Sequence, residues 1–437
     1  MATIVQARAA PDHAEGPSRA VSYSWIVFAF AFGLLISDYM ARQVLNATFP
    51  LLKAEWSLTD GELGLLSGVV ALMVALLTVP FSILADRWGR VKSLTLMAIL
   101  WSIATLVCAV AQNYSQMLLG RVLVGVGEAA YGSVGIALVI SVFPHRMRAT
   151  LSAAFMAGGL FGHVFGVAVA GEIAASHGWR AAFLAIGLGG LAIAILFPFV
   201  ITERRISHIV GSQSQAEAPR GAAPQRAKLP LKALFASRTV LLAYIGSGLQ
   251  QFCAGALPAW IPTFLNRYHH LPVDKAGQLS AMLFLMCGAG MILCGIASDR
   301  LARNRPERKI MLASAYCVGS AIALSVAMQC PPGVVQILFL AIAMFLVSGM
   351  AGPVGAMVAN LTPLAIHGTA FATLTLANNL LGFAPGPILT GWVADDLGLL
   401  GAFRLLPLIS LLAALIFFAA RKTYLTDLAK VAKISAD

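Results

Sequence analysis

The sequence predicts an all-α membrane protein with twelve transmembrane helices in two six-helix bundles. The first reason is its composition: 59% of the 437 residues are hydrophobic, 11% are charged and the mean hydropathy is +0.84. A typical soluble domain carries about 25% charged residues. The second reason is twelve long apolar stretches, and the third is a polar segment that divides them six and six. The composition therefore excludes a soluble enzyme and a nucleic-acid-binding protein.

Each predicted span is a continuous apolar run. A transmembrane helix needs roughly 20 predominantly apolar residues, whereas a strand of a membrane barrel would alternate apolar with polar residues. The runs do not alternate in this way, so each is predicted to be a helix. In chain order the predicted helices are 24–50, 64–85, 93–112, 115–142, 150–175, 180–201, 239–266, 276–298, 309–330, 333–361, 368–394 and 401–421.

The polar segments define the predicted domains. Residues 202–238 contain Ser-Gln and Ala-Pro tracts that cannot form a core, and this composition is typical of a linker. The predicted domains are a cytoplasmic tail at 1–23, an N-terminal six-helix bundle at 24–201, a cytoplasmic linker at 202–238, a C-terminal six-helix bundle at 239–421 and a cytoplasmic tail at 422–437.

The loop charges orient the predicted helices. On the side that carries both termini, the loops and tails hold 23 Lys and Arg residues, and the opposite side holds 5. Cytoplasmic loops of membrane proteins carry the excess of Lys and Arg. We therefore expect a multi-pass protein in the lipid bilayer of the cell's inner (plasma) membrane, with both termini in the cytoplasm.

The two halves repeat a short motif. Asp86, Arg87 and Arg90 follow the second predicted helix, and Asp299 and Arg300 follow the eighth, at an offset of 213 residues from Asp86 to Asp299. Internal repeats of this kind are typical of transporters that bind their substrate between two related bundles, near the middle of the membrane.

Four charged residues lie well inside predicted helices, away from the helix ends. Asp38 and Arg42 are four residues apart on the first helix and share one face, where they can pair. Arg121 and Glu128 are seven apart on the fourth helix and also share a face, so Arg121 is a candidate charge partner of Glu128. A charge at a helix centre costs about 2.5 to 3.5 kcal/mol on insertion scales. We therefore expect all four residues to face a central water-filled path.

These charges favour an anionic substrate and coupling to protons. A guanidinium cannot be deprotonated in a protein and presents a fork of donors that suits a carboxylate or phosphate, so Arg42 is predicted to bind the substrate. Glu128, removed from water, is expected to exchange a proton as Arg42 is occupied or released. Asp38 is a second candidate for proton coupling. Together they predict symport of protons with a small organic anion, such as a carboxylate, a sugar acid or an aromatic acid.

The second half offers neutral groups instead. Gln250 and Gln251 lie on the seventh predicted helix, and Asn378 and Asn379 lie on the eleventh. We expect these amides to bind and orient the substrate from the side opposite Arg42. The spacing leaves open which of Asn378 and Asn379 makes the contact.

The motifs resemble those of the major facilitator superfamily. They are the Asp-Arg-x-Gly-Arg turn at 86–90, the Arg-x-x-x-Gly-x-Gly run at 121–127, the Gly-Trp-Arg turn at 178–180 and the six-plus-six layout. The resemblance covers about residues 23–421 and implies the major facilitator fold and transport by alternating access.

The resemblance also implies a conformational latch. In the family, the acid of the loop after the second helix stabilises the outward-facing state, because it accepts charge-assisted hydrogen bonds from the neighbouring half in that state alone. We therefore expect Asp86, Arg87 and Arg90, with Asp299 and Arg300 in the repeat, to form this latch.

Within the superfamily, the runs 38–43 and 125–131 are most similar to the anion-cation symporter and spinster-like branches. That similarity implies substrate contact by Arg42 and by an Asn of the eleventh helix, and proton exchange at Glu128. Tyr131, which ends the second run, is predicted as a further substrate contact. The branches commonly have an acid where this chain has Ala41, and it remains open whether Asp38 takes its place.

Other functions are carried as alternatives. They are a spinster-like carrier of lysolipids or other amphiphiles, a proton-coupled exporter, and a non-transporting membrane receptor. Drug-proton antiporters of the superfamily have Pro and Gly on the fifth helix where this chain has His163 and Val167, which disfavours an exporter of that kind. His163 itself is predicted to be a packed, hydrogen-bonded residue.

The sequence contains no Gly-rich phosphate loop, metal-ligand cluster or nucleophile-base arrangement. We therefore expect no enzyme activity, cofactor or metal. The expected partners are the substrate anion, protons and the lipid bilayer, with no nucleic acid, and we expect a monomer.

Overall fold

The computed structural model describes residues 17–144, 147–207, 209, 237–303, 305, 307–362 and 366–434. Every regular element of these residues is a helix. Most of the predicted N-terminal tail and of the predicted linker, namely 1–16 and 210–236, lie outside the described residues.

The first half contributes six spans. The fourth of them is interrupted at Ala129 and Ala130, directly after Glu128. The helices are α1 (Pro17–Trp56), α2 (Asp60–Trp88), α3 (Arg90–Ala109), α4 (Tyr114–Glu128), α5 (Tyr131–Ser141), α6 (Arg148–His177) and α7 (Trp179–Val200).

The second half also contributes six spans. Counted along the whole chain, the tenth span is interrupted at Met350. The eleventh contains the π-helix η4 (Asn379–Phe383) between α14 (His367–Asn378) and α15 (Pro385–Ile434). A π-helix adds a residue to the turn and is frequent at functional sites. The remaining helices are α9 (Arg238–Tyr268), α10 (Val273–Leu301), α11 (Arg308–Ala327), α12 (Val334–Gly349) and α13 (Ala351–Asn360).

The predicted twelve transmembrane helices are confirmed. Eleven continuous stretches of the described residues are long and apolar enough to cross a membrane, and the last of them, Thr369–Tyr424, contains two spans. Gly398, with φ at 71°, breaks the helical path inside α15 and separates the two. This φ lies in the region that glycine adopts readily because it has no Cβ.

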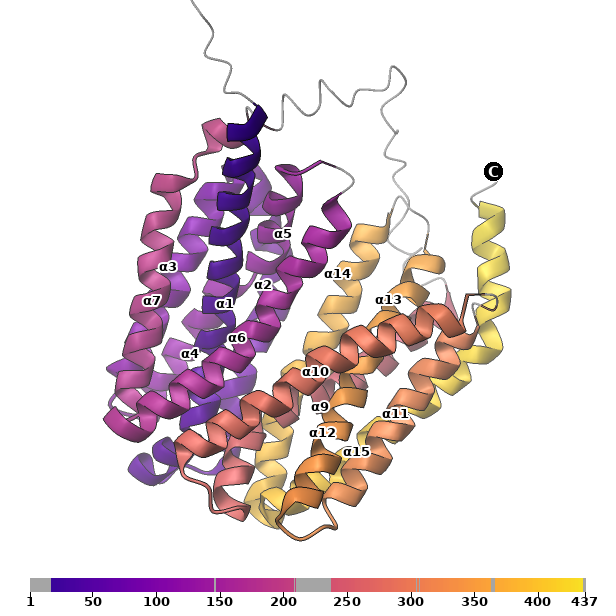
Figure 1. The fold of residues 1–437 in the computed structure, drawn as a ribbon. Coiled ribbons are helices and arrows are strands. Elements are labelled where there is room, and N and C mark those ends of the chain that lie inside the picture. Colours follow the sequence, from indigo (N-terminus) through magenta and orange to yellow (C-terminus); the bar gives the residue numbers. More distant parts are fainter. Residues whose placement is uncertain are drawn as a thin grey trace, which may run out of the picture.

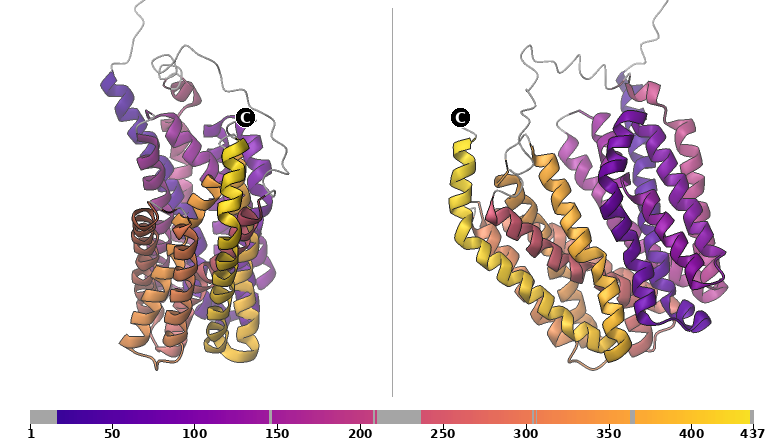
Figure 2. Two further views of the ribbon diagram at one scale, coloured as in Figure 1. Left: turned by 90° about the vertical axis from the view of Figure 1, so that its right-hand side faces the viewer. Right: turned by 180° about the vertical axis from the view of Figure 1, so that it is seen from behind.

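The helices form two groups that lie side by side. Figure 1 shows α1 to α7 on the left and α9 to α15 on the right, and the reverse view in Figure 2 shows the same division. The start of α1 and the C-terminus lie at the same end of the molecule (Figure 1). This arrangement places the contacts between the halves along the middle of the structure.

Helix α6 approaches α1 closely. A Cβ on Gly162 would lie 2.7 Å from the backbone oxygen of Ile36, and one on Gly166 would lie 2.9 Å from the Cα of Met40. Real Cβ atoms rarely tolerate such distances, so small residues are needed for this contact, as is common between transmembrane helices. The close approach brings residues of α6 beside Gln43 on α1.

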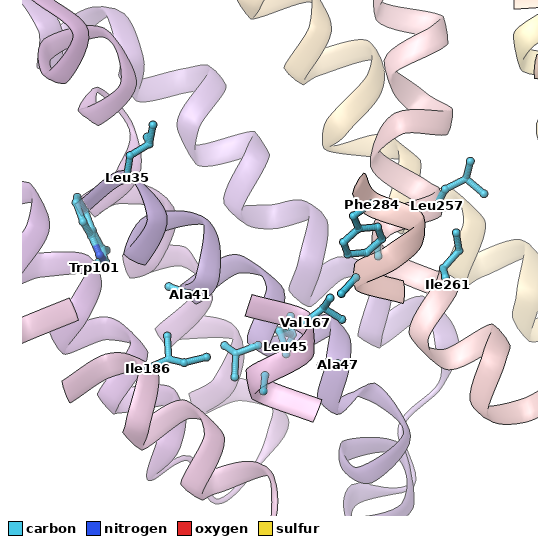
Figure 3. Packing of buried hydrophobic residues seen from close by; sticks show 14 of the residues in the cluster. Leu35, Ala41, Leu45, Ala47, Trp101, Val167, Ile186, Leu257, Ile261 and Phe284 are labelled. Atoms are coloured by element: carbon cyan, nitrogen blue, oxygen red, sulfur yellow. The ribbon is translucent and has the colours of Figure 1, made fainter. Parts of the chain in front are cut away.

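Apolar packing joins the two halves. A Cβ on Gly277 of α10 would lie 2.7 Å from the backbone oxygen of Val167 on α6, so these helices touch through their backbones. Figure 3 shows Val167 near Phe284 of α10, with Leu257 and Ile261 of α9 in the same buried cluster. The halves therefore share one part of the hydrophobic core.

Candidate functional site

A cavity of about 1000 Å³ lies between the two halves. Its first wall comes from α1, α2, α4 to α6, and its second wall comes from α9, α14, η4 and α15. The cavity extends from Asn46 to Asp86 and Thr369. Asp86 is exposed and lies in the last turn of α2, on the side of the molecule where α1 begins and α15 ends. We call this side the open end and the opposite side the closed end.

An ion pair lies in the first wall. Nε of Arg42 on α1 is 2.7 Å from Oε2 of Glu128 on α4, and the Glu128 side chain is 0% exposed. The guanidinium also lies over the ring of Tyr39, at 5.1 Å from its centroid. Neither Glu128 oxygen makes a hydrogen bond of good geometry within the described residues. The pair is therefore held by charge and remains free to exchange partners.

The structure corrects the pairing expected along each helix. Arg42 pairs with Glu128 across two helices rather than with Asp38 one turn away on its own helix. Asp38 is 3% exposed, lines the cavity, and lies near enough to Glu128 for the two carboxyl groups to interact. Two acids and one guanidinium thus meet at one point of the wall.

Arg121 makes no salt bridge with Glu128 in the described residues, contrary to expectation. It is 1% exposed and donates from Nε to the carbonyl of Leu66 at 3.2 Å and from Nη1 to the carbonyl of Ala41 at 2.9 Å. A guanidinium has five N–H donors, and carbonyl oxygens can accept hydrogen bonds from them. Arg121 therefore ties α4 to α1 and α2.

Four of the six predicted substrate contacts do not line the cavity. The hydroxyl of Tyr131 donates to the carbonyl of Ala31 at 2.7 Å. Gln250 is fully buried and donates to Ser320 at 3.1 Å, while Gln251 is half-buried outside the cavity lining. These side chains share an element with the cavity but project into the helix packing, which sequence spacing alone does not distinguish.

The two Asn residues of the eleventh span differ. Asn379 lines the cavity and is 7% exposed, with Nδ2 donating to the carbonyl of Thr375 at 2.9 Å. Asn378 lies outside the lining, and its Oδ1 accepts a hydrogen bond from Ser247 at 2.7 Å. The π-helix η4 begins at Asn379, so from this residue on the side chains point in other directions than they would in a continuous α-helix. Of the pair, Asn379 is the one in position to meet a substrate.

The second wall is mainly apolar opposite Arg42. Its residues there are Ala254, Gly255, Pro258, Ala259, Phe383 and Pro387. The expectation that the second half presents several amides to the substrate is therefore wrong, because Asn379 is the only amide that this wall contributes to the described lining.

A salt-bridge network shuts the closed end. Asp60, at the start of α2 and 3% exposed, accepts from Nη1 and Nη2 of Arg267 on α9 at 2.7 and 2.6 Å. Lys53 of α1 donates to the same carboxylate at 2.6 Å. Two parallel bonds between Arg and a carboxylate are strong and fix the geometry. This network joins the two halves.

A second acid reinforces the same closure from the other half. Oδ1 of Asp395 on α15 accepts from the backbone N–H of Asp60 at 2.6 Å, and Oδ2 accepts from that of Gly61 at 2.9 Å. The first N–H groups of a helix have no partner within the helix and carry partial positive charge. Asp395 therefore caps α2 across the interface between the halves.

The predicted latch residues make no salt bridge between the halves within the described residues. Nη1 of Arg90 donates to the carbonyl of Ala137 in its own half at 3.1 Å, and Asp299 pairs with Lys309 in its own half at 2.9 Å. Asp86, Arg87 and Arg300 are exposed and make no salt bridge within the described residues. The latch therefore stays a prediction, and its candidate residues make no ion pair across the halves in this arrangement of the described residues.

Several lining residues were not singled out from the sequence. They are Gln43, Asn46 and Ser67; His163, which was predicted to be a packed, hydrogen-bonded residue, lines the cavity as well. Asn46 follows Arg42 by four residues and so shares its helix face, which is a signal that the sequence did contain. The network of Asp60, Arg267 and Asp395 left no comparable signal, because its members lie far apart in the chain.

A model of the Major Facilitator Superfamily matches residues 30–385. The probable L-galactonate transporter of Escherichia coli is 25% identical over 376 residues, which are 83% of this chain and 82% of that protein. Protein spinster homolog 1 of Bos taurus is 27% identical over 408 residues, which are 86% of this chain and 74% of that protein.

Two solved structures share the fold. The crystal structure of a bacterial homolog to human lysosomal transporter, Spinster, in inward-facing and unoccupied conformation has a TM-score of 0.79 at 21% identity, and covers 93% of this chain and 98% of that one. The crystal structure of D-xylose-proton symporter has a TM-score of 0.72 at 18% identity, and covers 91% and 97%.

The Asp60 network predicts a measurable effect on the closed end. We expect Asp60→Asn to weaken this end, since removing one partner of a buried ion pair leaves the other charges uncompensated, at a cost of about 3 to 5 kcal/mol. Cysteines are introduced at Gln112 and Pro332, which lie in loops of opposite halves, and carry spin labels. In double electron–electron resonance measurements, the distance between the two labels should gain a longer population in Asp60→Asn.

The matched control is Asp299→Asn, which removes an exposed ion pair at the open end and should leave the distances unchanged. Labelling of the chain without the two introduced cysteines gives the background from its six native cysteines. An Asp60→Asn distance distribution identical to that of the parent would show that the network does not maintain the closure.

Proposed function

The chain belongs to the Major Facilitator Superfamily, and on that basis we propose that it is a secondary active transporter that carries a small organic anion together with protons by alternating access. The observation that carries this proposal is the ion pair of Arg42 and Glu128 in the wall of the cavity between the halves. A permanent cation there suits an anionic substrate, and its buried acid partner suits proton exchange.

Charge balance links the two solutes. Asp38 and Glu128 supply two negative charges and Arg42 and Arg121 supply two positive charges, so the empty site is neutral when both acids are ionised. A proton on Glu128 frees the guanidinium of Arg42 and leaves one net positive charge. A monovalent anion bound at Arg42 restores neutrality. An uncompensated charge inside the membrane is costly. The protein would therefore change conformation when the site is empty, or when it holds both the proton and the anion.

The two ends of the cavity supply the alternation. In the described arrangement the closed end is held by Asp60, Arg267 and Asp395, while the latch at Asp86 is free. In the opposite arrangement the latch would engage and the Asp60 network would open. The Lys and Arg excess supports a cytoplasmic position for the open end and both termini, in the inner membrane, and we propose a monomer surrounded by lipid.

A carrier of lysolipids or other amphiphiles is the second candidate. The apolar second wall and the cavity volume of about 1000 Å³ favour it, since both would accommodate a hydrocarbon chain. Relatives named protein spinster homolog 1 and a relative named probable L-galactonate transporter are about equally similar to this chain. The charges beside the cavity favour the organic anion.

Replacing Arg42 tests the substrate charge. We expect Arg42→Gln to weaken binding of monovalent carboxylates about tenfold or more, because the anion loses its fork of donors. A panel of hexanoate, benzoate and gluconate, with lysophosphatidylcholine as the amphiphile, is titrated against purified protein by thermal shift and calorimetry.

The double variant Arg42→Gln with Glu128→Gln removes both members of the ion pair, so the net charge of the site is unchanged, and it is the control for folding. It should bind carboxylates as weakly as the single variant does. Carboxylate affinity that Arg42→Gln leaves unchanged would reject the assignment, and binding of the lysolipid alone would favour the second candidate.

Replacing Glu128 tests the coupling. We expect Glu128→Gln to abolish accumulation driven by a pH gradient in proteoliposomes, because the site no longer gains or loses a proton there. Exchange of labelled for unlabelled substrate should persist, since Arg42 still binds the anion. Glu172→Gln, an exposed acid at the closed end, should alter neither activity. Equal loss of both activities in Glu128→Gln would argue against a dedicated coupling role.

A further inference from the structure

Two acids and two basic residues meet at the closed end, and each half of the molecule contributes one of each. Lys53 on α1 and Asp60 on α2 belong to the first half, with Nζ 2.6 Å from Oδ1. Arg267 on α9 and Asp395 on α15 belong to the second half. The halves can therefore separate at this end without either one gaining a net charge from these four residues, which keeps the Coulomb cost of separation low.

In the described arrangement, Arg267 and Asp395 both bind Asp60 rather than each other. The guanidinium donates to the carboxylate of Asp60 at 2.6 and 2.7 Å, and Asp395 accepts from the backbone N–H of Asp60 at 2.6 Å. No salt bridge joins Arg267 to Asp395 in the part of the chain that the structure describes. Because both side chains contact one residue, little more than that residue separates them.

Two hydrogen bonds join α9 to α15 near this point. Nε1 of Trp260 on α9 donates to a backbone carbonyl of α15 at 3.0 Å, and the backbone N–H of Leu400 on α15 donates to the hydroxyl of Tyr268 at 3.1 Å. Arg267 directly precedes Tyr268, and Asp395 lies five residues before Leu400. Both bonds lie within the second half, so separation of the halves does not break them and leaves Arg267 beside Asp395.

Helix α2 has a cap of its own in the first half. Oγ1 of Thr59 accepts from the backbone N–H of Glu62 at 3.1 Å, and the Glu62 carboxylate accepts from the backbone N–H of Thr59 at 2.9 Å, which together form a capping box. Asp395 covers the two N–H groups between them, those of Asp60 and Gly61. Water can bind these groups when the closed end opens. Asp395 can thus leave α2 while the capping box stays in place.

We infer that Asp395 is the alternate partner of Arg267. When the closed end opens, Arg267 turns from Asp60 to Asp395, and the start of α2 is released. Lys53 keeps its bond to Asp60. All four charges then stay paired, each within its own half. The inference rests on the alternating access of the proposed function, because it describes the arrangement in which this end is open.

The test measures the balance between the open and the closed arrangement of this end. The distance between spin labels at Gln112 and Pro332 is recorded in Asp60→Asn, whose open population is expected to be larger. Adding Asp395→Asn removes the charge that pairs with Arg267 but keeps an oxygen that can accept from α2. We expect the ratio of the longer to the shorter distance to fall about twofold to fivefold, since an ion pair in contact with water is weak.

Replacing Arg267 shows whether this effect passes through the guanidinium. In Asp60→Asn with Arg267→Gln, no guanidinium remains to pair with Asp395, so adding Asp395→Asn should leave the ratio unchanged. The comparison is a double-mutant cycle, which isolates the pair from the other contacts of Asp395. Asp395→Glu, which keeps the charge, should preserve the ratio of Asp60→Asn.

The matched control is Asp396→Asn, which removes the neighbouring exposed acid. The Asp396 side chain makes no salt bridge within the described residues. This change should therefore not alter the ratio in Asp60→Asn.

A role of Asp395 as a cap alone predicts a different result. In that case Asp395→Asn would raise the ratio or leave it unchanged in Asp60→Asn, and either outcome overturns the partner exchange. An equal fall with and without Arg267 also overturns it, as does an Asp60→Asn variant that gains no longer distance. If the ratios follow the prediction but neither carboxylates nor protons are transported, the proposed symport fails and the partner exchange stands.

Discussion

The structure depends on the placement of a permanent positive charge inside a membrane protein. Arg42 cannot lose its proton, so it needs a negative partner at every stage. In the described arrangement that partner is Glu128, whose side chain is completely buried. A transported anion is the other group that can take this role. We propose that alternation between this fixed acid and a mobile anion gives the cavity its selectivity and couples proton binding to transport.

In the proposed cycle, contacts at the two ends of the molecule would turn this local exchange into a change of access. At the closed end, two acids meet at the N-terminus of α2. Asp60 forms an ion pair with Arg267, and Asp395 accepts hydrogen bonds from the first backbone N–H groups of the helix. These contacts cross between the halves, so they must break when this end opens. The central charges can affect them because α1 and α2 contribute both to the cavity wall and to the closed end.

The sequence predicted the fold well because apolar length and charged loops are one-dimensional signals. The twelve spans, the family and the position of Arg42 and Glu128 on the cavity wall followed from them. The partners of buried charges did not follow, since Arg121 satisfies its guanidinium with the carbonyls of Leu66 and Ala41. Which of Asn378 and Asn379 faces the cavity depends on the π-helix that begins at Asn379. Residue spacing cannot predict a shift of one residue in the helix turn. The contact of His163 with Gln43 requires the close approach of α6 to α1, which the spacing of residues does not reveal.

The most direct test of the central claim is the net charge moved per transported anion. In proteoliposomes on a solid-supported membrane, the account predicts that a monovalent substrate anion enters with one proton, so that a pH-sensitive dye reports proton entry while no sustained current is measured. A steady substrate-dependent current without proton entry would contradict the exchange between Glu128 and the anion at Arg42.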